Sequence, residues 1–202
     1  MSLNNNINGI LLVGKMGAGK TTVMESIRSN YGYTKHSMAT WLKDTIQSHY
    51  RLKEIRKNDK IKIGDKELTV RRVLQLFGTE VIRNFDPQWH VDEVINRINT
   101  IGGWPIQTYK FIIDDIRFLN EVEGLTNQFK CVTIRVDSNE RKRVERICLR
   151  DGLVPTPEQL SHKSETETDL IKCDHIINNN GSLNELHNEI KEVMNRVNET
   201  NS

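Results

Sequence analysis

The fold is decided by residues 10–27, which read ILLVGKMGAGKTTVMESI. Four apolar residues, Ile10 to Val13, form a continuous run of the kind found in a strand buried on both faces. A glycine-rich loop follows, and from Gly19 to Ser29 the pattern is helical. The stretch therefore predicts a strand, a tight loop and a helix in direct succession.

The loop from Gly14 to Thr21 matches the pattern GxxxxGK[ST] in full. Glycines allow successive backbone N–H groups to turn toward phosphate oxygens, and the following helix adds its positive N-terminus. We expect Lys20 to reach the outer phosphates and the Thr21 hydroxyl to hold Mg²⁺. The alternative is a glycine-rich turn between two core elements, but the strand before and the helix after favour a phosphate-binding loop (P-loop). The expected ligand is ATP, bound by Gly14, Lys15, Met16, Gly17, Ala18, Gly19, Lys20, Thr21 and Thr22.

The rest of the chain alternates between strand-like and helix-like segments. Further strands are expected at 33–36, 109–115, 130–136 and 175–178, and further helices at 38–49, 88–101, 120–128, 139–150 and 182–197. Thr69 reads as the N-cap of another helix, with apolar residues at 70, 73, 74, 77 and 81. The charged segment 51–68 is expected to be an irregular or hairpin insert, and 152–168 a loop. This order predicts a P-loop NTPase fold in one domain over 1–202, with its core at about 9–197: three α/β/α layers around a mostly parallel, five-stranded sheet.

In such sheets ligands bind beyond the C-terminal ends of the strands, where Gly14, Asp137 and the pair Asp114–Asp115 would fall. A carboxylate at this position of a P-loop protein serves Mg²⁺, so Asp114 is a candidate metal ligand together with Thr21. Arg117, two residues further on, is a candidate for gripping an anionic group. Two acids at a strand end also occur as simple turn chemistry, which is the alternative.

Two basic clusters could reach the loop. Arg71 and Arg72 lie off the apolar stripe of their helix, next to Gln75, Gly78 and Thr79, and the alternative is a solvated surface pair. Residues 139–152 read NERKRVERICLRDG and place three arginines on one side of a helix. They predict a mobile lid over 139–168 that closes over transferring phosphates, while the alternative is an ordinary charged surface helix. The three lid arginines are Arg143, Arg146 and Arg150.

Composition excludes several classes of protein. A net charge of +2 over 202 residues is too small for a protein that coats nucleic acid or a membrane. The three cysteines form no CxxC pair and fit reduced thiols, and no apolar stretch approaches the ~18 residues of a bilayer span. The N-terminus also lacks the features of a signal peptide. We therefore expect a cytoplasmic protein with neither a nucleic-acid polymer nor a membrane as partner.

The arginines also favour one kind of phosphate acceptor. A monophosphate, whose second pKa is about 6, is largely ionised at neutral pH and needs arginines rather than a general base. An alcohol acceptor would instead need a well-placed Asp or Glu. The several arginines of this chain favour a monophosphate.

Four blocks carry a resemblance to a known family: RRVLQLFGTEVIRNFDPQWHV (71–91), IIDDIRFLNEVE (112–123), SHKSE (161–165) and DHIINNNGSLNEL (174–186). With the glycine loop in front, they resemble phage-type deoxynucleoside monophosphate kinases over about residues 9–197. The resemblance implies transfer of the ATP γ-phosphate to a deoxynucleoside 5′-monophosphate with Mg²⁺, and an acceptor-binding region at about 38–100. It ranks Asp115 above Asp114, because Asp115 and Arg117 match the D-x-R of the family. The implied acceptor-site residues are Arg71, Arg72, Gln75, Gly78, Thr79, Trp89, Asp115, Arg117, His162, Ser164 and Glu165. The candidate catalytic residues are Lys20, Asp115 and Arg117, together with Arg143, Arg146 and Arg150 of the predicted lid.

Alternatives to this function remain open. The arginine-rich stretch 141–160 resembles the lids of dephospho-coenzyme A kinases and animal-type phosphomevalonate kinases, so the acceptor could be another phosphorylated small molecule. A P-loop regulatory or nucleic-acid-remodelling ATPase is a third reading, and the small net charge counts against it. A homodimer is possible, and the cytoplasm would be that of the host if a bacteriophage encodes the chain.

Overall fold

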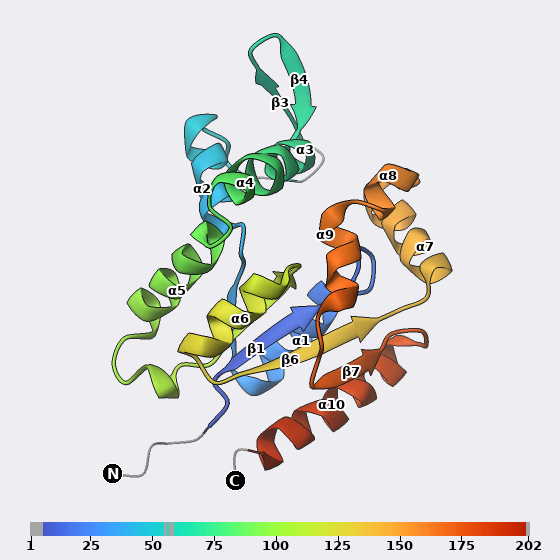
Figure 1. Ribbon diagram of the computed structural model, residues 1–202. Coiled ribbons are helices and arrows are strands. Elements are labelled where there is room, and N and C mark those ends of the chain that lie inside the picture. Colours follow the sequence, from blue (N-terminus) through green and yellow to red (C-terminus); the bar gives the residue numbers. More distant parts are fainter. Residues whose placement is uncertain (1–5, 55, 57–58, 201–202) are drawn as a thin grey trace.

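The computed structural model describes residues 6–54, 56 and 59–200, and Figure 1 shows their arrangement. Within these residues one sheet has five strands in the order β2-β5-β1-β6-β7, and every neighbouring pair is parallel. This confirms the expected sheet: the last strand has the expected bounds, and those of the others differ by at most two residues. The strands are β1 (Gly9–Val13), β2 (Thr34–His36), β5 (Phe111–Ile116), β6 (Cys131–Asp137) and β7 (His175–Asn178).

Helices cover both faces of the sheet. As a result, the side chains of β1, which alternate between the two faces, are fully buried in two different cores. Ile10 and Leu12 pack with α1 (Lys20–Tyr31) and α10 (Leu183–Glu199) on one face. Leu11 and Val13 pack on the other face with α5 (Trp89–Gly102) and α6 (Leu119–Gln128). The three-layer α/β/α fold is therefore confirmed (Figure 1). The described part of the chain holds no helix that combines the length and apolar character needed to cross a bilayer.

The region between β2 and α5 projects above the sheet (Figure 1) and has its own small core. It contains α2 (Thr40–His49), the antiparallel hairpin β3 (Lys60–Ile63) and β4 (Lys66–Thr69), and α3 (Val70–Gln75). The insert at 51–68 thus ends in a hairpin, one of the two forms expected, while residues 55, 57 and 58 of that prediction lie outside the described residues. The core of the whole region between β2 and α5 is formed by Leu42, Ile46, Ile61, Val70 and Val73.

The helix predicted from residue 70 begins as expected and then changes its geometry. The Thr69 side chain accepts a hydrogen bond from the Arg72 N–H at 3.2 Å, which confirms the N-cap. From Leu76 to Ile82 the helix is a π-helix, followed by the short α4 (Arg83–Phe85). Within the π-helical turn the Gly78 carbonyl lies 2.9 Å from Nε2 of the buried His90, a tertiary contact that no helical periodicity encodes.

The expectation of a loop over 152–168 holds for 152–156 and 161–162 and is wrong for the rest. After α7 (Glu140–Asp151) the chain forms α8 (Pro157–Leu160), α9 (Lys163–Thr166) and a 3₁₀ turn, Glu167–Leu170. Two local caps explain these turns: Thr156 accepts from the Gln159 N–H, and His162 accepts from the Ser164 N–H. Each helix is too short to show an apolar period. A further 3₁₀ turn, Ile106–Thr108, precedes β5.

Candidate active site

The glycine loop has the backbone that the motif predicts. Gly17 and Gly19 take the positive φ angles of 79° and 99°, which residues with a side chain rarely adopt. A Cβ at Gly17 would lie 2.5 Å from the Arg143 carbonyl oxygen, and a Cβ at Gly19 would collide with the side-chain amide of Asn179. The loop is therefore a tight cradle that only glycine can line at these two points.

Lys20 opens helix α1 and is buried within the loop. Its ammonium group donates hydrogen bonds to the carbonyl oxygens of Gly14 and, at 3.1 Å, Lys15. Thr21 and Thr22 follow in the first helical turn with exposed side chains. The loop thus has a fixed positive charge at its centre and hydroxyl groups at the helix N-terminus.

Helix α7 lies against the loop and reaches it through two of the three predicted lid arginines. Arg143 Nη1 lies 3.3 Å from the Met16 carbonyl oxygen, and Arg146 Nη1 lies 3.4 Å from that of Gly17. Arg146 also donates to the backbone and side-chain oxygens of Asn179, at 2.8 and 3.1 Å. The Asn179 amide in turn donates to the Ala18 carbonyl at 2.8 Å, so α7 and the end of β7 together hold the loop from outside.

The third lid arginine is not brought to the loop. Arg150 forms a bidentate ion pair with Asp151, with nitrogen–oxygen distances of 2.8 and 2.7 Å, and half of its side chain is exposed. Its position at the end of α7 keeps it one turn away from the Arg146 contacts.

The D-x-R and H-x-[ST]-E blocks meet at the tip of the loop. The Met16 N–H donates to Glu165 Oε2 at 2.6 Å, and Glu165 Oε1 accepts from Arg117 Nη1. Arg117 Nη1 also lies 3.4 Å from the Ser164 carbonyl oxygen. His162 Nδ1 lies 2.9 Å from Ser164 Oγ, so the histidine orders the start of α9. Glu165 consequently links the glycine loop directly to Arg117.

The two adjacent arginines of α3 point in different directions. Arg71 places Nη1 3.2 Å from Met16 Sδ and Nη2 2.8 Å from Asp151 Oδ2. Arg72 instead pairs with Glu80 at 2.6 Å, and 46% of its side chain is exposed. Only Arg71 is therefore directed at the loop.

The remaining residues implied for the acceptor lie on α3, the π-helix and the start of α5. Gln75 is half-buried, and the Gly78 carbonyl is occupied by His90. Trp89 is 45% exposed and meets Trp41 edge to face, with ring centroids 6.1 Å apart. The side chain of Thr79 lies outside the described residues.

The two aspartates at the end of β5 have separate environments. Asp115 accepts from the Met38 N–H at 2.8 Å and from Ser37 Oγ at 2.6 Å. Burial alone would raise the pKa of Asp115, but Lys43, these two hydrogen bonds and Arg117 together hold that pKa below its usual value. Asp115 thus fastens the segment that enters α2.

Asp114 shows the opposite shift. Burial, and then the charge of Asp115, raise the pKa of Asp114, while Lys35 at 3.6 Å, Lys43 and Lys20 act to lower it. Asp114 lies at the C-terminal end of β5, the strand next to β1, and its ion-pair partner is Lys35. Groups of three or more His, Cys, Asp or Glu side chains suited to a metal are absent from the residues that the structure describes. A P-loop Mg²⁺ site needs fewer protein ligands, because phosphates and water supply the others.

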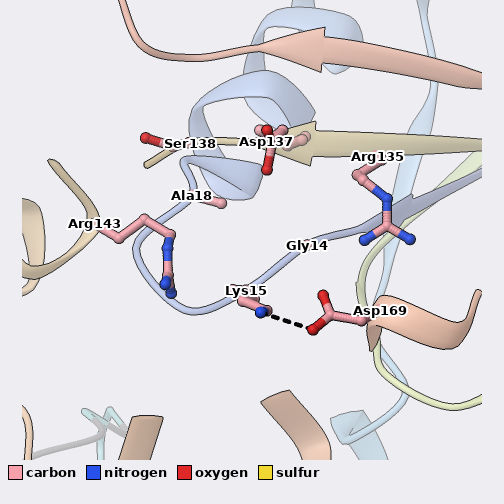
Figure 2. Close-up of a pocket in the computed structure, with 9 residues that line it drawn as sticks. Gly14, Lys15, Ala18, Arg135, Asp137, Ser138, Arg143 and Asp169 are labelled. Carbon is pink, nitrogen blue, oxygen red and sulfur yellow. Dashed lines mark ion pairs between the residues drawn. The ribbon is translucent and has the colours of Figure 1, made fainter. Parts of the chain in front are cut away.

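A polar pocket of about 120 Å³ lies beside the loop and contains the predicted sheet-edge residue Asp137. Figure 2 shows Lys15 directed at Asp169, with Nζ and Oδ2 2.8 Å apart. Arg135 borders the same pocket and donates to the carbonyl oxygens of Thr168 and Ile171, at 3.0 and 2.6 Å. A pocket of this size suits a phosphate group rather than a whole nucleoside.

Sequence reasoning missed the acids and the amide that surround the loop. Asp151, the last residue of α7, pairs with Arg71, and Asp169, in the 3₁₀ turn Glu167–Leu170, pairs with Lys15; no local pattern marks these long-range partners. Asn179 could have been found, because it follows β7 directly and so falls at the edge of the sheet where ligands bind.

Comparison with known proteins places the chain by its fold. No protein-family model matches the chain, and no curated protein matches it in sequence. Among solved structures it is similar to TT1252 from Thermus thermophilus, with 20% identity and a TM-score of 0.58 over 95% of this chain and 98% of the other. It is also similar to a shikimate kinase from Acinetobacter baumannii in complex with shikimate (15%, TM-score 0.52) and to a gluconokinase from Sinorhizobium meliloti 1021 (14%, TM-score 0.53), each over 96% of this chain and 95% of the other. The chain therefore shares the fold of P-loop kinases.

Proposed function

We propose that this chain transfers the γ-phosphate of ATP to the phosphate group of a deoxynucleoside 5′-monophosphate. The observation that carries the proposal is that the glycine loop, the candidate site for ATP, meets two arginines, the candidate site for the acceptor phosphate, at Met16. Arg71 contacts the Met16 side chain, and Arg117 is linked to the Met16 N–H through Glu165. The loop suits a triphosphate, and the two arginines at its tip suit a second, smaller anion.

The chemistry asked of these residues is positioning and charge stabilisation. An oxygen of the acceptor monophosphate attacks the γ-phosphorus, and the bond from that phosphorus to the leaving ADP oxygen breaks. Lys20 would stabilise the charge on the outer phosphates, and Arg117 would act on the acceptor phosphate. Arg143 and Arg146 would hold the loop in shape through its carbonyl oxygens. A monophosphate brings its own ionised oxygen, so the reaction needs no general base.

The residues at the loop also fit the expected Mg²⁺. Thr21 is exposed in the first turn of α1, and Asp114 lies at the C-terminal end of β5, the strand next to β1 that leads into the loop. These two groups would hold the ion, whose charge offsets that of the phosphates when it is bound. Asp115, with both oxygens engaged by Ser37 and Met38, would act as a positioning residue for α2.

A coupled assay of ADP release tests the proposal across acceptors of different chemistry. The panel is the four deoxynucleoside monophosphates, dephospho-coenzyme A and phosphomevalonate, with shikimate and gluconate as alcohol acceptors. We expect ADP release that depends on at least one deoxynucleoside monophosphate. Turnover of another acceptor alone would assign the chain to a different small-molecule kinase. Slow hydrolysis unaffected by any acceptor would favour a P-loop ATPase.

A further inference from the structure

A second pocket, of about 330 Å³, lies on the other side of α9 from the phosphate-binding loop. Lys163 and Glu167 border this pocket one helical turn apart, whereas Glu165 between them is buried and binds Met16. The other walls come from α4 with the turn after it and from the start of α6 (Figure 1). The volume falls at the lower end of the range for small-molecule sites, ~300–1,000 Å³.

One wall of the pocket is held rigidly by Arg83, whose side chain is only 10% exposed. The guanidinium group lies 3.7 Å above the ring of Phe118, forms an ion pair with Glu121 and donates to Asn120 Oδ1 at 3.0 Å. The Asn120 amide then donates to the Pro87 carbonyl at 2.8 Å. The interlocked contacts join the two walls before any ligand arrives, so the pocket is preformed.

The lining combines apolar surfaces with polar borders. Pro87, Phe118 and Leu119 supply apolar area, while the polar lining includes the amides of Asn84 and Asn120 and the Lys163–Glu167 ion pair, with Nζ and Oε1 3.2 Å apart. A flat heterocycle has the matching character, with apolar faces and hydrogen-bonding edges. A polyhydroxylated acceptor would bury unpaired hydroxyl groups against the apolar part, which is costly.

The pocket is also in the right place for the acceptor. Phe118, which lines the pocket, directly follows Arg117, the arginine assigned to the acceptor phosphate. Glu165, which pairs with Arg117 and accepts from the Met16 N–H, lies in sequence between Lys163 and Glu167 of the pocket lining. A molecule with its phosphate at Arg117 can therefore extend its other end into this pocket. We propose that the pocket binds the nucleobase of the acceptor, an inference that rests on the proposed function and locates base recognition at α4, α6 and α9.

Filling the pocket provides the test. Leu119 is 41% exposed, so Leu119→Trp should fold and occupy the space of a base. Leu183→Trp makes the same change at the N-terminus of α10, where the leucine is 58% exposed, and serves as the control. Steady-state kinetics would give KM for the best deoxynucleoside monophosphate and for ATP. Competitive inhibition would give Ki for deoxyribose 5-phosphate, which carries the phosphate and sugar without a base.

We expect Leu119→Trp to raise KM for the deoxynucleoside monophosphate at least tenfold. KM for ATP and Ki for deoxyribose 5-phosphate should stay within twofold, and Leu183→Trp should match the unchanged protein. An unaltered KM, or equal losses for the monophosphate and the baseless inhibitor, would overturn the inference.

A failure of the proposed function is distinguishable from a failure of this inference. If the unchanged protein phosphorylates no deoxynucleoside monophosphate, calorimetric titration with the four deoxynucleosides decides the pocket alone. Binding that Leu119→Trp abolishes and Leu183→Trp keeps would sustain a nucleobase site. Absence of binding at millimolar deoxynucleoside would remove it.

Discussion

Lys20 is the side chain on which the proposed phosphate-binding site depends most directly. It is buried at the start of α1 and donates hydrogen bonds to loop carbonyls, so its charge sits at the centre of the cradle. We expect Lys20→Ala to lower kcat by at least ~100-fold, as for loss of a preorganised charge that stabilises a transition state. Lys191→Ala, on the exposed surface of α10, is the control. A Lys20→Ala enzyme that keeps most of its kcat would disprove the phosphate-binding role of the loop.

The Arg71–Arg72 pair illustrates what a sequence leaves open at single residues. Helical periodicity showed that both arginines lie off the apolar face, but it could not rank them. Their different roles follow from their partners. Arg71 contacts Met16 of the loop and Asp151 of α7, while Arg72 pairs with Glu80 of the π-helix that continues α3. Position relative to another element is not encoded in the local pattern.

These partners predict different effects of the two arginines on kinetics. Arg71→Ala should raise the acceptor KM by ~10-fold or more, because a charge-assisted contact to a phosphate is lost, and should leave the ATP KM nearly unchanged. Arg72→Ala should change either KM by less than about twofold, since an exposed ion pair contributes little. Steady-state kinetics on the two purified variants would measure both. A larger effect at Arg72 would show that its side chain turns inward when the acceptor binds.

At the scale of elements, the alternation of strands and helices was predictable, because the apolar residues of each long element recur with the period of a strand or of a helix. Leu11 and Val13 face one core and Ile10 and Leu12 the other, which is why a continuous apolar run indicated a strand buried on both sides. The helices at 157–170 were not predictable in this way. They are single turns fixed by caps and by ties such as Glu165 to Met16, which come from a distant part of the chain.

The contact between the loop and α7 gives a prediction for glycine substitutions. Gly17 and Gly32 have similar left-handed φ angles, 79° and 74°, but only Gly17 would place a Cβ against backbone, 2.5 Å from the Arg143 oxygen. Gly32→Ala should lower the free energy of unfolding by ~1–2 kcal/mol, the cost of that conformation, and keep activity. Gly17→Ala should have the same cost and also displace α7, which raises the KM for ATP at least ~10-fold.

Urea unfolding and steady-state kinetics would separate the two effects of these substitutions. Equal stability losses combined with an unchanged ATP KM in Gly17→Ala would show that α7 does not rest on the loop in solution. Loss of activity in Gly32→Ala would show that left-handed strain alone, without any contact to α7, disturbs the site.

At the scale of the whole molecule, most of the described buried apolar side chains fall into three clusters. The region between β2 and α5, which is the proposed acceptor region, has a cluster of its own beside the two that flank the sheet. Ile61 of the hairpin lies in this separate cluster, and Ile134 of β6 lies in the core shared by the sheet, α1 and α10. Both isoleucines are at most 5% exposed, so truncation removes a similar amount of buried apolar surface from each core. Regions with a core of their own can open without unfolding the rest.

The matched substitutions Ile61→Ala and Ile134→Ala should therefore behave differently. Ile134→Ala should destabilise the whole protein by ~2–5 kcal/mol and lower the main Tm by roughly 4–20 °C. Ile61→Ala should leave the main transition within a few degrees, because its cost falls on the local opening of α2, α3 and the hairpin, and should raise the acceptor KM while the ATP KM holds. Calorimetry, hydrogen exchange of residues 60–69 and kinetics would test this. If Ile61→Ala lowers the main Tm as far as Ile134→Ala does, the proposed acceptor region unfolds together with the sheet. The region would then lack the independence that would let it move over a bound acceptor.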